Sequence, residues 1–183
     1  MKGEIETNES TPDEKYRQIL SEDQIRKRIK ELGQQISEDY RDKCPILIGV
    51  LNGGFIFMAD LIRELKIDCE VDFIKISSYG NDTKSSGKIR LLKDVDAHVE
   101  GRDILIVEDI VDSGRSVQFM QNRFAAMKPK SLRFVSLLLK EENAAVDFKI
   151  DYLGFSIPNE FVVGYGLDYS QKFRNLRSIY VMK

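Results

Sequence analysis

The sequence has little cysteine and histidine, and it has no tryptophan. Its 183 residues include two cysteines and one histidine. Because the sequence has no export signal, we do not expect Cys44 and Cys69 to form a disulfide framework, and with His98 they supply too few ligands for a structural zinc site. We therefore expect both cysteines to be structural, as small buried apolar residues. A single histidine in a polar stretch, with no G-x-S-x-G motif, also excludes Ser-His-Asp hydrolysis.

The sequence also lacks long apolar runs and an excess of one charge. Residues 1–15 are too polar for an export signal, and no apolar run approaches the ~20 residues that span a bilayer. The 28 basic and 30 acidic residues give a formal net charge of -2, without the clustered basic face that nucleic acid requires. Neither G-x-G-x-x-G nor G-x-x-x-x-G-K-[ST] occurs, which excludes dinucleotide dehydrogenases and P-loop NTPases. We expect a cytoplasmic protein that binds neither membrane nor nucleic acid.

A helix-start signal lies near the N-terminus. Ser21 and Gln24 have the spacing of a capping box. A row of apolar residues at helical spacing follows: Ile25, Ile29, Leu32 and Ile36. This pattern predicts an amphipathic surface helix. Residues 1–12, rich in Glu, Asn, Ser and Thr, are expected to form a flexible tail.

Three short segments are apolar on both faces, at residues 45–51, 103–107 and 133–139. Stretches with helical character follow the first two, at 55–65 and 117–127. Strands that are buried on both faces and separated by helices are typical of a parallel sheet covered on both sides. Shorter β-rich pieces are expected at 69–77, 152–157 and 161–167, with a long polar loop at 78–88. We therefore predict a single α/β domain that spans residues 1–183.

Carboxylates and phosphate-binding groups follow one another after the 103–107 strand. The expected turn begins with the acids Glu108, Asp109 and Asp112, and it continues into a helix start with Ser113, Gly114, Arg115 and Ser116. Such a helix start binds phosphate, whereas carboxylates suit sugar hydroxyls or a Mg²⁺ that bridges to further phosphate. Phosphoribosyl pyrophosphate fits both the acidic part of this segment and the helix start, because it carries hydroxyls, a phosphate and a pyrophosphate. The simpler alternative is a turn of solvated acids that cap the helix.

The segment at 107–116 resembles the sugar-pyrophosphate motif of the type I phosphoribosyltransferases. The similarity extends over residues 45–183 and is greatest to the hypoxanthine-guanine phosphoribosyltransferases. Four further segments carry it: 51–54, 78–79, 138–140 and 161–169. The resemblance implies a central, mostly parallel sheet flanked by helices, with a small hood formed by the chain ends. It also implies transfer of the phosphoribosyl group to hypoxanthine or guanine, which gives IMP or GMP and pyrophosphate in purine salvage.

The resemblance implies a role for each matched acid. Asp112 matches the catalytic acid or base near N7 of the purine. Glu108 and Asp109 match the acids that hold the ribose hydroxyls, directly or through Mg²⁺. Asp168 matches a second acid of the metal site, close to the purine. The 5′-phosphate cradle is matched by Ser113, Gly114, Arg115 and Ser116.

The remaining matched residues are implied to contact the purine and the pyrophosphate. Lys140 matches the lysine that reads the purine O6, and Phe161 the aromatic residue that stacks on the base, with the Val162 backbone at its edge. Leu51, Asn52 and Gly53 match the pyrophosphate loop, and Arg174 matches a further pyrophosphate contact. Ser78 and Tyr79 match the mobile flap that closes over the reacting centre. In this family the pyrophosphate loop often holds a cis peptide bond that does not involve proline.

Three positions depart from the usual pattern of the family. Ser113 replaces threonine and Arg115 replaces lysine, so a hydroxyl and a cation are kept. Asn52 stands where many relatives have lysine, which leaves Mg²⁺ and Arg174 as candidates to neutralise the pyrophosphate. Two alternative functions stay open: an RNA-binding regulator on the same fold, and a transferase that prefers xanthine. The resemblance implies a homodimer or homotetramer.

Overall fold

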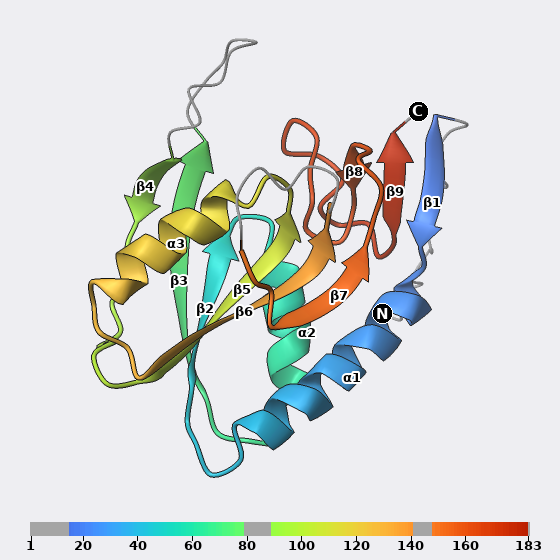
Figure 1. Ribbon diagram of the computed structural model, residues 1–183. Coiled ribbons are helices and arrows are strands. Elements are labelled where there is room, and N and C mark those ends of the chain that lie inside the picture. The colour runs from blue at the N-terminus through green and yellow to red at the C-terminus, as the bar shows by residue number, and fades with distance from the viewer. Residues whose placement is uncertain (1–14, 79–88, 141–147, 183) are drawn as a thin grey trace, which may run out of the picture.

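A six-stranded sheet forms the centre of the molecule in the computed structural model, which describes residues 15–78, 89–140 and 148–182. The strands lie in the order β4-β3-β2-β5-β6-β7 (Figure 1). Their bounds are β2 (Ile46–Leu51), β3 (Glu70–Ser78), β4 (Ile89–Lys93), β5 (Asp103–Val111), β6 (Ser131–Leu139) and β7 (Tyr152–Ser156). Only the edge strand β4 runs antiparallel to its neighbour. The carboxyl ends of the other five strands therefore share one edge of the sheet, where ligands bind in such folds.

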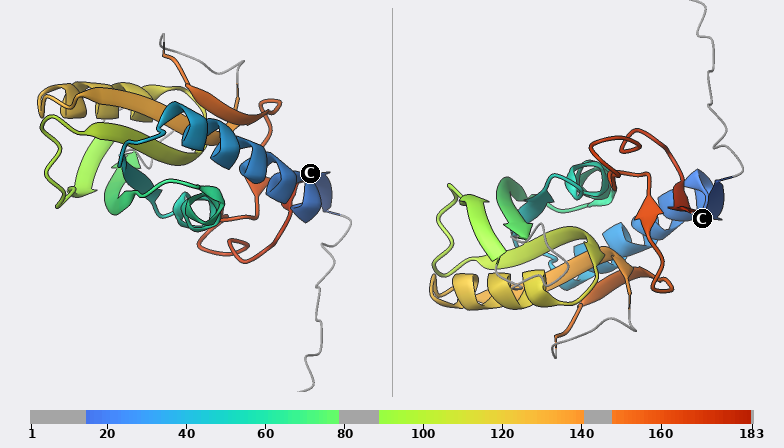
Figure 2. Two further views of the ribbon diagram at one scale, coloured as in Figure 1. Left: turned by 90° about the horizontal axis from the view of Figure 1, so that it is seen from below. Right: turned by 90° about the horizontal axis from the view of Figure 1, so that it is seen from above.

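Helices cover both faces of this sheet, as the apolar strands predicted. Helices α1 (Glu22–Asp39) and α2 (Phe55–Glu64) pack on one face, and α3 (Arg115–Ala125) packs on the other (Figure 2). Each face has its own apolar core. Phe57 and Leu61 of α2 are fully buried in one of them, and Met120 and Phe124 of α3 are fully buried in the other.

The first helix begins where its sequence signal indicated. The Ser21 hydroxyl accepts a hydrogen bond from the backbone N–H of Gln24 at 3.3 Å, and the Gln24 side chain accepts one from the Ser21 N–H at 2.8 Å. These reciprocal bonds satisfy two backbone donors that the helix cannot satisfy itself. The predicted apolar row forms the buried side of α1, which faces the sheet: Ile25, Ile29, Leu32 and Ile36.

A small antiparallel sheet brings the two ends of the described chain together. It consists of β1 (Tyr16–Leu20), β9 (Ile179–Met182) and β8 (Val162–Val163), with β9 in the centre. Figure 1 shows this sheet beside the carboxyl edge of the main sheet. This is the expected hood, although β1 and β9 were not expected as strands.

The structure corrects three details. Strand β5 does not end at residue 107 but runs on to Val111, because β6 continues to pair with it as far as Leu139. Cys44 is exposed and Cys69 is half-buried, whereas both were expected to be buried. The β-rich piece at 161–167 forms only the short β8, since the chain then turns at Gly164 and Gly166, whose φ angles are +99° and +94°. Across the described residues, no helix is both long and apolar enough to span a membrane.

Candidate active site

A cavity of roughly 530 Å³ lies at the carboxyl edge of the main sheet, below the hood. Its walls come from the ends of β2, β3 and β5, from the residue after β6 and from the hood. Ten of the residues singled out in the sequence line it: Leu51, Asn52, Gly53, Asp109, Asp112, Lys140, Phe161, Val162, Asp168 and Arg174. These residues are up to 123 positions apart in the chain, counted from Leu51 to Arg174, and the fold gathers them around one space.

The segment expected to hold a phosphate lies next to this cavity. Gly114 is the N-cap residue of α3 with φ +77°, a conformation that favours glycine. Its neighbours Ser113, Arg115 and Ser116 surround the same helix start, and within the described chain none of these four residues lines the cavity itself. Ser78 is the last residue of β3. Tyr79 lies outside the described residues.

The turn after β2 packs tightly against the acidic strand end. The peptide bond between Leu51 and Asn52 is cis. A Cβ atom added at Gly53 would lie 1.7 Å from Asp109 Oδ2, so a larger residue there would force the Asp109 carboxylate or the turn to move. From the other side, a Cβ added at Gly166 would lie 2.2 Å from the Gly53 carbonyl oxygen. The turn is therefore held between β5 and the hood.

The neighbouring acids of β5 face opposite sides of the sheet, as successive strand residues do. Glu108 accepts a hydrogen bond from Ser116 at the start of α3, whereas Asp109 lies against Gly53, just before α2. Burial, with a smaller contribution from Asp109, raises the pKa of Glu108 from 4.5 to about 8. Burial also raises the pKa of Asp109 from 3.8 to about 6. One oxygen of Glu108, Oε1, is buried without a hydrogen-bond partner among the described residues.

An ammonium group and a carboxylate lie side by side at the cavity wall. Lys140 follows β6 directly, and its Nζ donates to Asp112 Oδ2 at 3.1 Å. The Lys140 backbone N–H donates to the carbonyl of Val111 at 3.0 Å. This bond fixes the segment after β6 relative to the segment after β5. The Lys140 side chain is 10% exposed and that of Asp112 51% exposed. The pair thus presents one donor and one acceptor to a ligand from a largely buried position.

The hood contributes a second ion pair and an aromatic rim. Arg174 contacts Asp168 at 2.6 Å and donates to the carbonyl of Gly166 at 2.7 Å. Phe161 and Tyr169 meet edge to face with ring centroids 5.9 Å apart, and each residue is 51% exposed. Phe161 therefore keeps exposed surface at the cavity wall, where a flat ligand could stack on it.

The acids of the site offer partial coordination to a metal ion. Asp109 and Asp168 both line the cavity, and the charge of Asp168 contributes to the raised pKa of Asp109. Over the described residues, however, no three His, Cys, Asp or Glu side chains are close enough to hold one ion. This arrangement suits Mg²⁺, which commonly takes one or two carboxylates and completes its shell with water and substrate phosphate.

Several residues that line the cavity were not singled out in the sequence, among them Lys75, Ser77, Leu92 and Gln171. Lys75 and Ser77 lie on β3, which pairs with β2 so that Lys75 is in register with Leu51. The order of strands in the sheet creates this neighbourhood. No local pattern in the sequence signals it.

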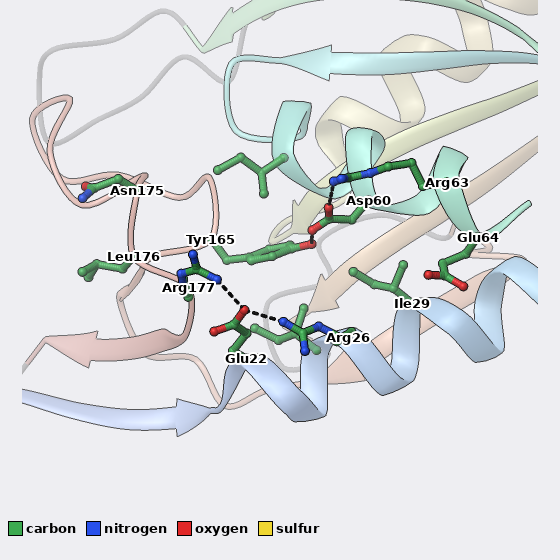
Figure 3. A pocket seen from close by; sticks show the side chains of 12 residues that line it. Glu22, Arg26, Ile29, Asp60, Arg63, Glu64, Tyr165, Asn175, Leu176 and Arg177 are labelled. Carbon is green, nitrogen blue, oxygen red and sulfur yellow. Dashed lines mark hydrogen bonds and ion pairs between the residues drawn. The ribbon is translucent and has the colours of Figure 1, made fainter. Parts of the chain in front are cut away.

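A second cavity, of roughly 460 Å³, lies between α1, α2 and the hood segment that includes Tyr165 (Figure 3). Its arginines already have acidic partners. Glu22 accepts from Arg26 at 2.6 Å and from Arg177 at 2.8 Å. Asp60 pairs with Arg63 and accepts a hydrogen bond from the Tyr165 hydroxyl. Because these charges are neutralised within the protein, this cavity is a weaker candidate for an anionic substrate.

Comparison with known proteins identifies relatives of the whole described fold. The phosphoribosyl transferase domain family matches residues 15–170. The hypoxanthine-guanine phosphoribosyltransferase of Bacillus subtilis is 48% identical over 165 residues, which cover 90% of this chain and 92% of that protein. The enzyme of the same name from Streptococcus pyogenes is 44% identical over the same shares.

Solved structures agree with the sequence comparison. A hypoxanthine-guanine phosphoribosyltransferase from Bacillus anthracis superimposes with a TM-score of 0.87 at 46% identity, covering 91% of this chain and 98% of that one. A hypoxanthine phosphoribosyltransferase from Staphylococcus aureus also gives a TM-score of 0.87, at 38% identity and 91% coverage of both chains. The chain therefore belongs to the phosphoribosyltransferase family.

Proposed function

We propose that this protein is a purine salvage enzyme, which transfers the phosphoribosyl group of phosphoribosyl pyrophosphate to hypoxanthine and guanine. The main support for this proposal is the contact between the side chains of Lys140 and Asp112. A 6-oxopurine presents O6 and N7 side by side on one edge. An ammonium group and a carboxylate 3.1 Å apart match that edge when Lys140 donates to O6 and Asp112 faces N7.

The same pair disfavours adenine. Adenine has an amino group at position 6, which is a donor rather than an acceptor. It would face the Lys140 ammonium, donor against donor, and this position is largely desolvated because the Lys140 side chain is 10% exposed. An unmatched polar contact of this kind costs about 1–3 kcal/mol. Phe161 supplies a flat apolar surface for the ring in either case, so it does not discriminate between the two bases.

The sugar donor spans the rest of the site in this proposal. Its 5′-phosphate lies at the start of α3, beside Ser113, where the backbone amides of the first helical turn can donate to an anion. Its pyrophosphate lies by the turn at Leu51–Gly53, with Arg174 nearby. Mg²⁺ held by Asp109 or Asp168 would offset the charge of the leaving pyrophosphate.

In the reaction the purine N9 forms a bond to C1′ of the ribose as the bond from C1′ to the pyrophosphate oxygen breaks. Positive charge develops on the ribose ring during this exchange, close to the carboxylate of Asp109. Asp112 accepts the proton that leaves N7, which makes N9 more nucleophilic. General base catalysis of this type contributes about 10²–10⁴-fold.

A turnover assay with Mg²⁺, phosphoribosyl pyrophosphate and hypoxanthine, guanine, xanthine or adenine in parallel tests the proposal. We expect turnover of hypoxanthine and guanine with release of pyrophosphate. Asp112→Asn keeps the shape of the side chain but cannot take a proton, so kcat should fall about 10²–10⁴-fold while affinity for the sugar donor is maintained. Wild-type protein without turnover would refute the proposed function. A fully active Asp112→Asn variant would refute only the role of Asp112.

The RNA-binding alternative is less well supported. It predicts a basic surface, whereas the chain has a formal net charge of -2. A filter-binding assay with RNA completes the test, since binding at physiological salt without turnover would favour the regulator.

A further inference from the structure

We propose that Lys75 binds the pyrophosphate group of the sugar donor and supplies a positive charge at the turn Leu51–Gly53. This inference rests on the proposed function and adds a residue to its site. Three cations line the main cavity in the described chain: Lys75, Lys140 and Arg174. Two of them are already engaged with acids, and Lys75 is the exception.

The contrast between these cations is clear from their contacts. Lys140 bonds to Asp112 at 3.1 Å, and Arg174 contacts Asp168 at 2.6 Å. For Lys75, no ion pair or hydrogen bond of the side chain is found in the parts of the chain that the structure describes. Lys75 is nevertheless half-buried. When a ligand fills the cavity and displaces water, this ammonium needs an anion beside it, because an unpaired charge is costly to desolvate.

The position of Lys75 in the sheet determines which part of a ligand it meets. Strands β2 and β3 are parallel, and Leu51 is in register with Lys75, so the two side chains share a face of the sheet. Phe73, two residues earlier on β3, packs against the face that α2 covers, close to Gly49 and Met58. Lys75 therefore lies on the α2 side, beside the turn that leads into this helix. It is on the side of the sheet opposite to α3.

Stability does not account for a lysine at this position. Across the antiparallel pair β3–β4, Lys75 is in register with Lys93. The pairing is irregular between Lys75 and Ile76, however, and Lys93 contacts Asp72 at 3.6 Å on the other face of β3, so the two ammonium groups do not oppose each other. Lys93 has its own partners, since its Nζ donates to the carbonyl of Phe73 at 3.0 Å and to Asp96 at 3.1 Å. Lys75 makes no ion pair or side-chain hydrogen bond in the described chain, so this lysine adds no such contact to the sheet.

Lys75→Met tests the proposal, with calorimetry of magnesium pyrophosphate binding and steady-state kinetics as readouts. A hydrogen bond to a charged group contributes enough that its loss should weaken pyrophosphate binding about 10- to 100-fold and raise the KM of the sugar donor similarly. The KM of hypoxanthine should stay within about twofold. IMP lacks a pyrophosphate, and its 5′-phosphate is assigned to the α3 side, so its affinity should not change.

Two matched variants make the test specific. Lys75→Arg keeps the charge and should retain most of the pyrophosphate affinity. Lys93→Met removes the same charge from the facing strand and should bind pyrophosphate like the wild type. Equal pyrophosphate affinity in Lys75→Met and the wild type would overturn the proposal, and so would an equal loss in Lys93→Met, which would indicate a long-range charge effect.

The test of Lys75 can fail or succeed independently of the test of the proposed function. If the wild type binds magnesium pyrophosphate but shows no turnover, the proposed function fails, and the dependence of binding on Lys75 is still measured. If turnover is normal and Lys75→Met binds pyrophosphate normally, only the present inference fails. Melting curves are recorded first, and Lys75→Gln replaces Lys75→Met if the latter is unfolded.

Discussion

Replacing Glu108 by glutamine should make the ligand-free protein more stable at alkaline pH. The carboxyl group of Glu108 is buried, and its pKa is raised from 4.5 to about 8. In the unfolded chain it releases its proton above pH 4.5, whereas in the folded protein it keeps the proton up to about pH 8. The unfolded state therefore binds fewer protons between these values, and stability falls as the pH rises through this window.

The size of this effect follows from the shift. Each pKa unit corresponds to about 1.36 kcal/mol. Ionisation of Glu108 should therefore lower the free energy of unfolding by about 3 kcal/mol between pH 5 and pH 8. Glutamine has nearly the same shape and no such titration. In a chain of 183 residues, 1 kcal/mol changes the melting temperature by about 2–4 °C. The quantity to compare is the melting temperature of Glu108→Gln minus that of the wild type. This difference should be larger at pH 8 than at pH 5 by roughly 6–12 °C.

Thermal melts followed by circular dichroism at pH 5, 6, 7 and 8 measure this difference without ligand or metal. Asp109, whose pKa is raised to about 6, is present in both proteins, so its contribution largely cancels. Glu38→Gln, on an exposed part of α1, controls for the change in net charge. A difference between wild type and Glu108→Gln that stays constant from pH 5 to pH 8 would show that Glu108 is not protonated in the folded protein.

Three further changes have expected outcomes. Gly53→Ala places a Cβ atom 1.7 Å from Asp109 Oδ2 and displaces that carboxylate or the turn, so kcat/KM for the sugar donor should fall at least about tenfold in the turnover assay; unchanged kinetics would mean that neither displacement matters to the site. Lys140→Ala removes a charged donor, so the KM of hypoxanthine should rise about 10- to 100-fold with little effect on pyrophosphate affinity; an unaltered preference over adenine would exclude Lys140 as the reader of O6. Phe124→Ala empties a fully buried site beneath α3 and should lower the free energy of unfolding in urea by about 3–5 kcal/mol, and a loss below 1 kcal/mol would contradict this packing.

Much of the fold could be predicted because local physics determines it. The bonds between Ser21 and Gln24 form within one turn, so their spacing alone indicates the start of α1. Strands β2 and β6 are apolar on both faces because helices cover both sides of the sheet, and this leaves a visible pattern in the sequence. Burial of α1 follows in the same way from its helical row of isoleucines and leucine.

Other features depend on which strands become neighbours, and the sequence does not display this directly. Glu108 and Asp109 were expected in a turn, but pairing with β6 keeps them in β5, where they face opposite sides. The place of Lys75 in the cavity depends on the register between β3 and β2. The pairing of β1 with β9 joins segments from opposite ends of the chain, and neither has a distinctive pattern of its own.

The pairing of β1 with β9 has a consequence for the order of events on the ribosome. Strand β1 is made first, yet its partner starts at Ile179, 159 residues after Leu20. At about 5–20 residues per second this interval takes roughly 8–30 s. During that time the six strands of the main sheet can assemble, since β7 ends at Ser156, while β1 waits without a neighbour. The hood over the cavity is therefore the last part to form, because β9 begins 23 residues after the end of β7.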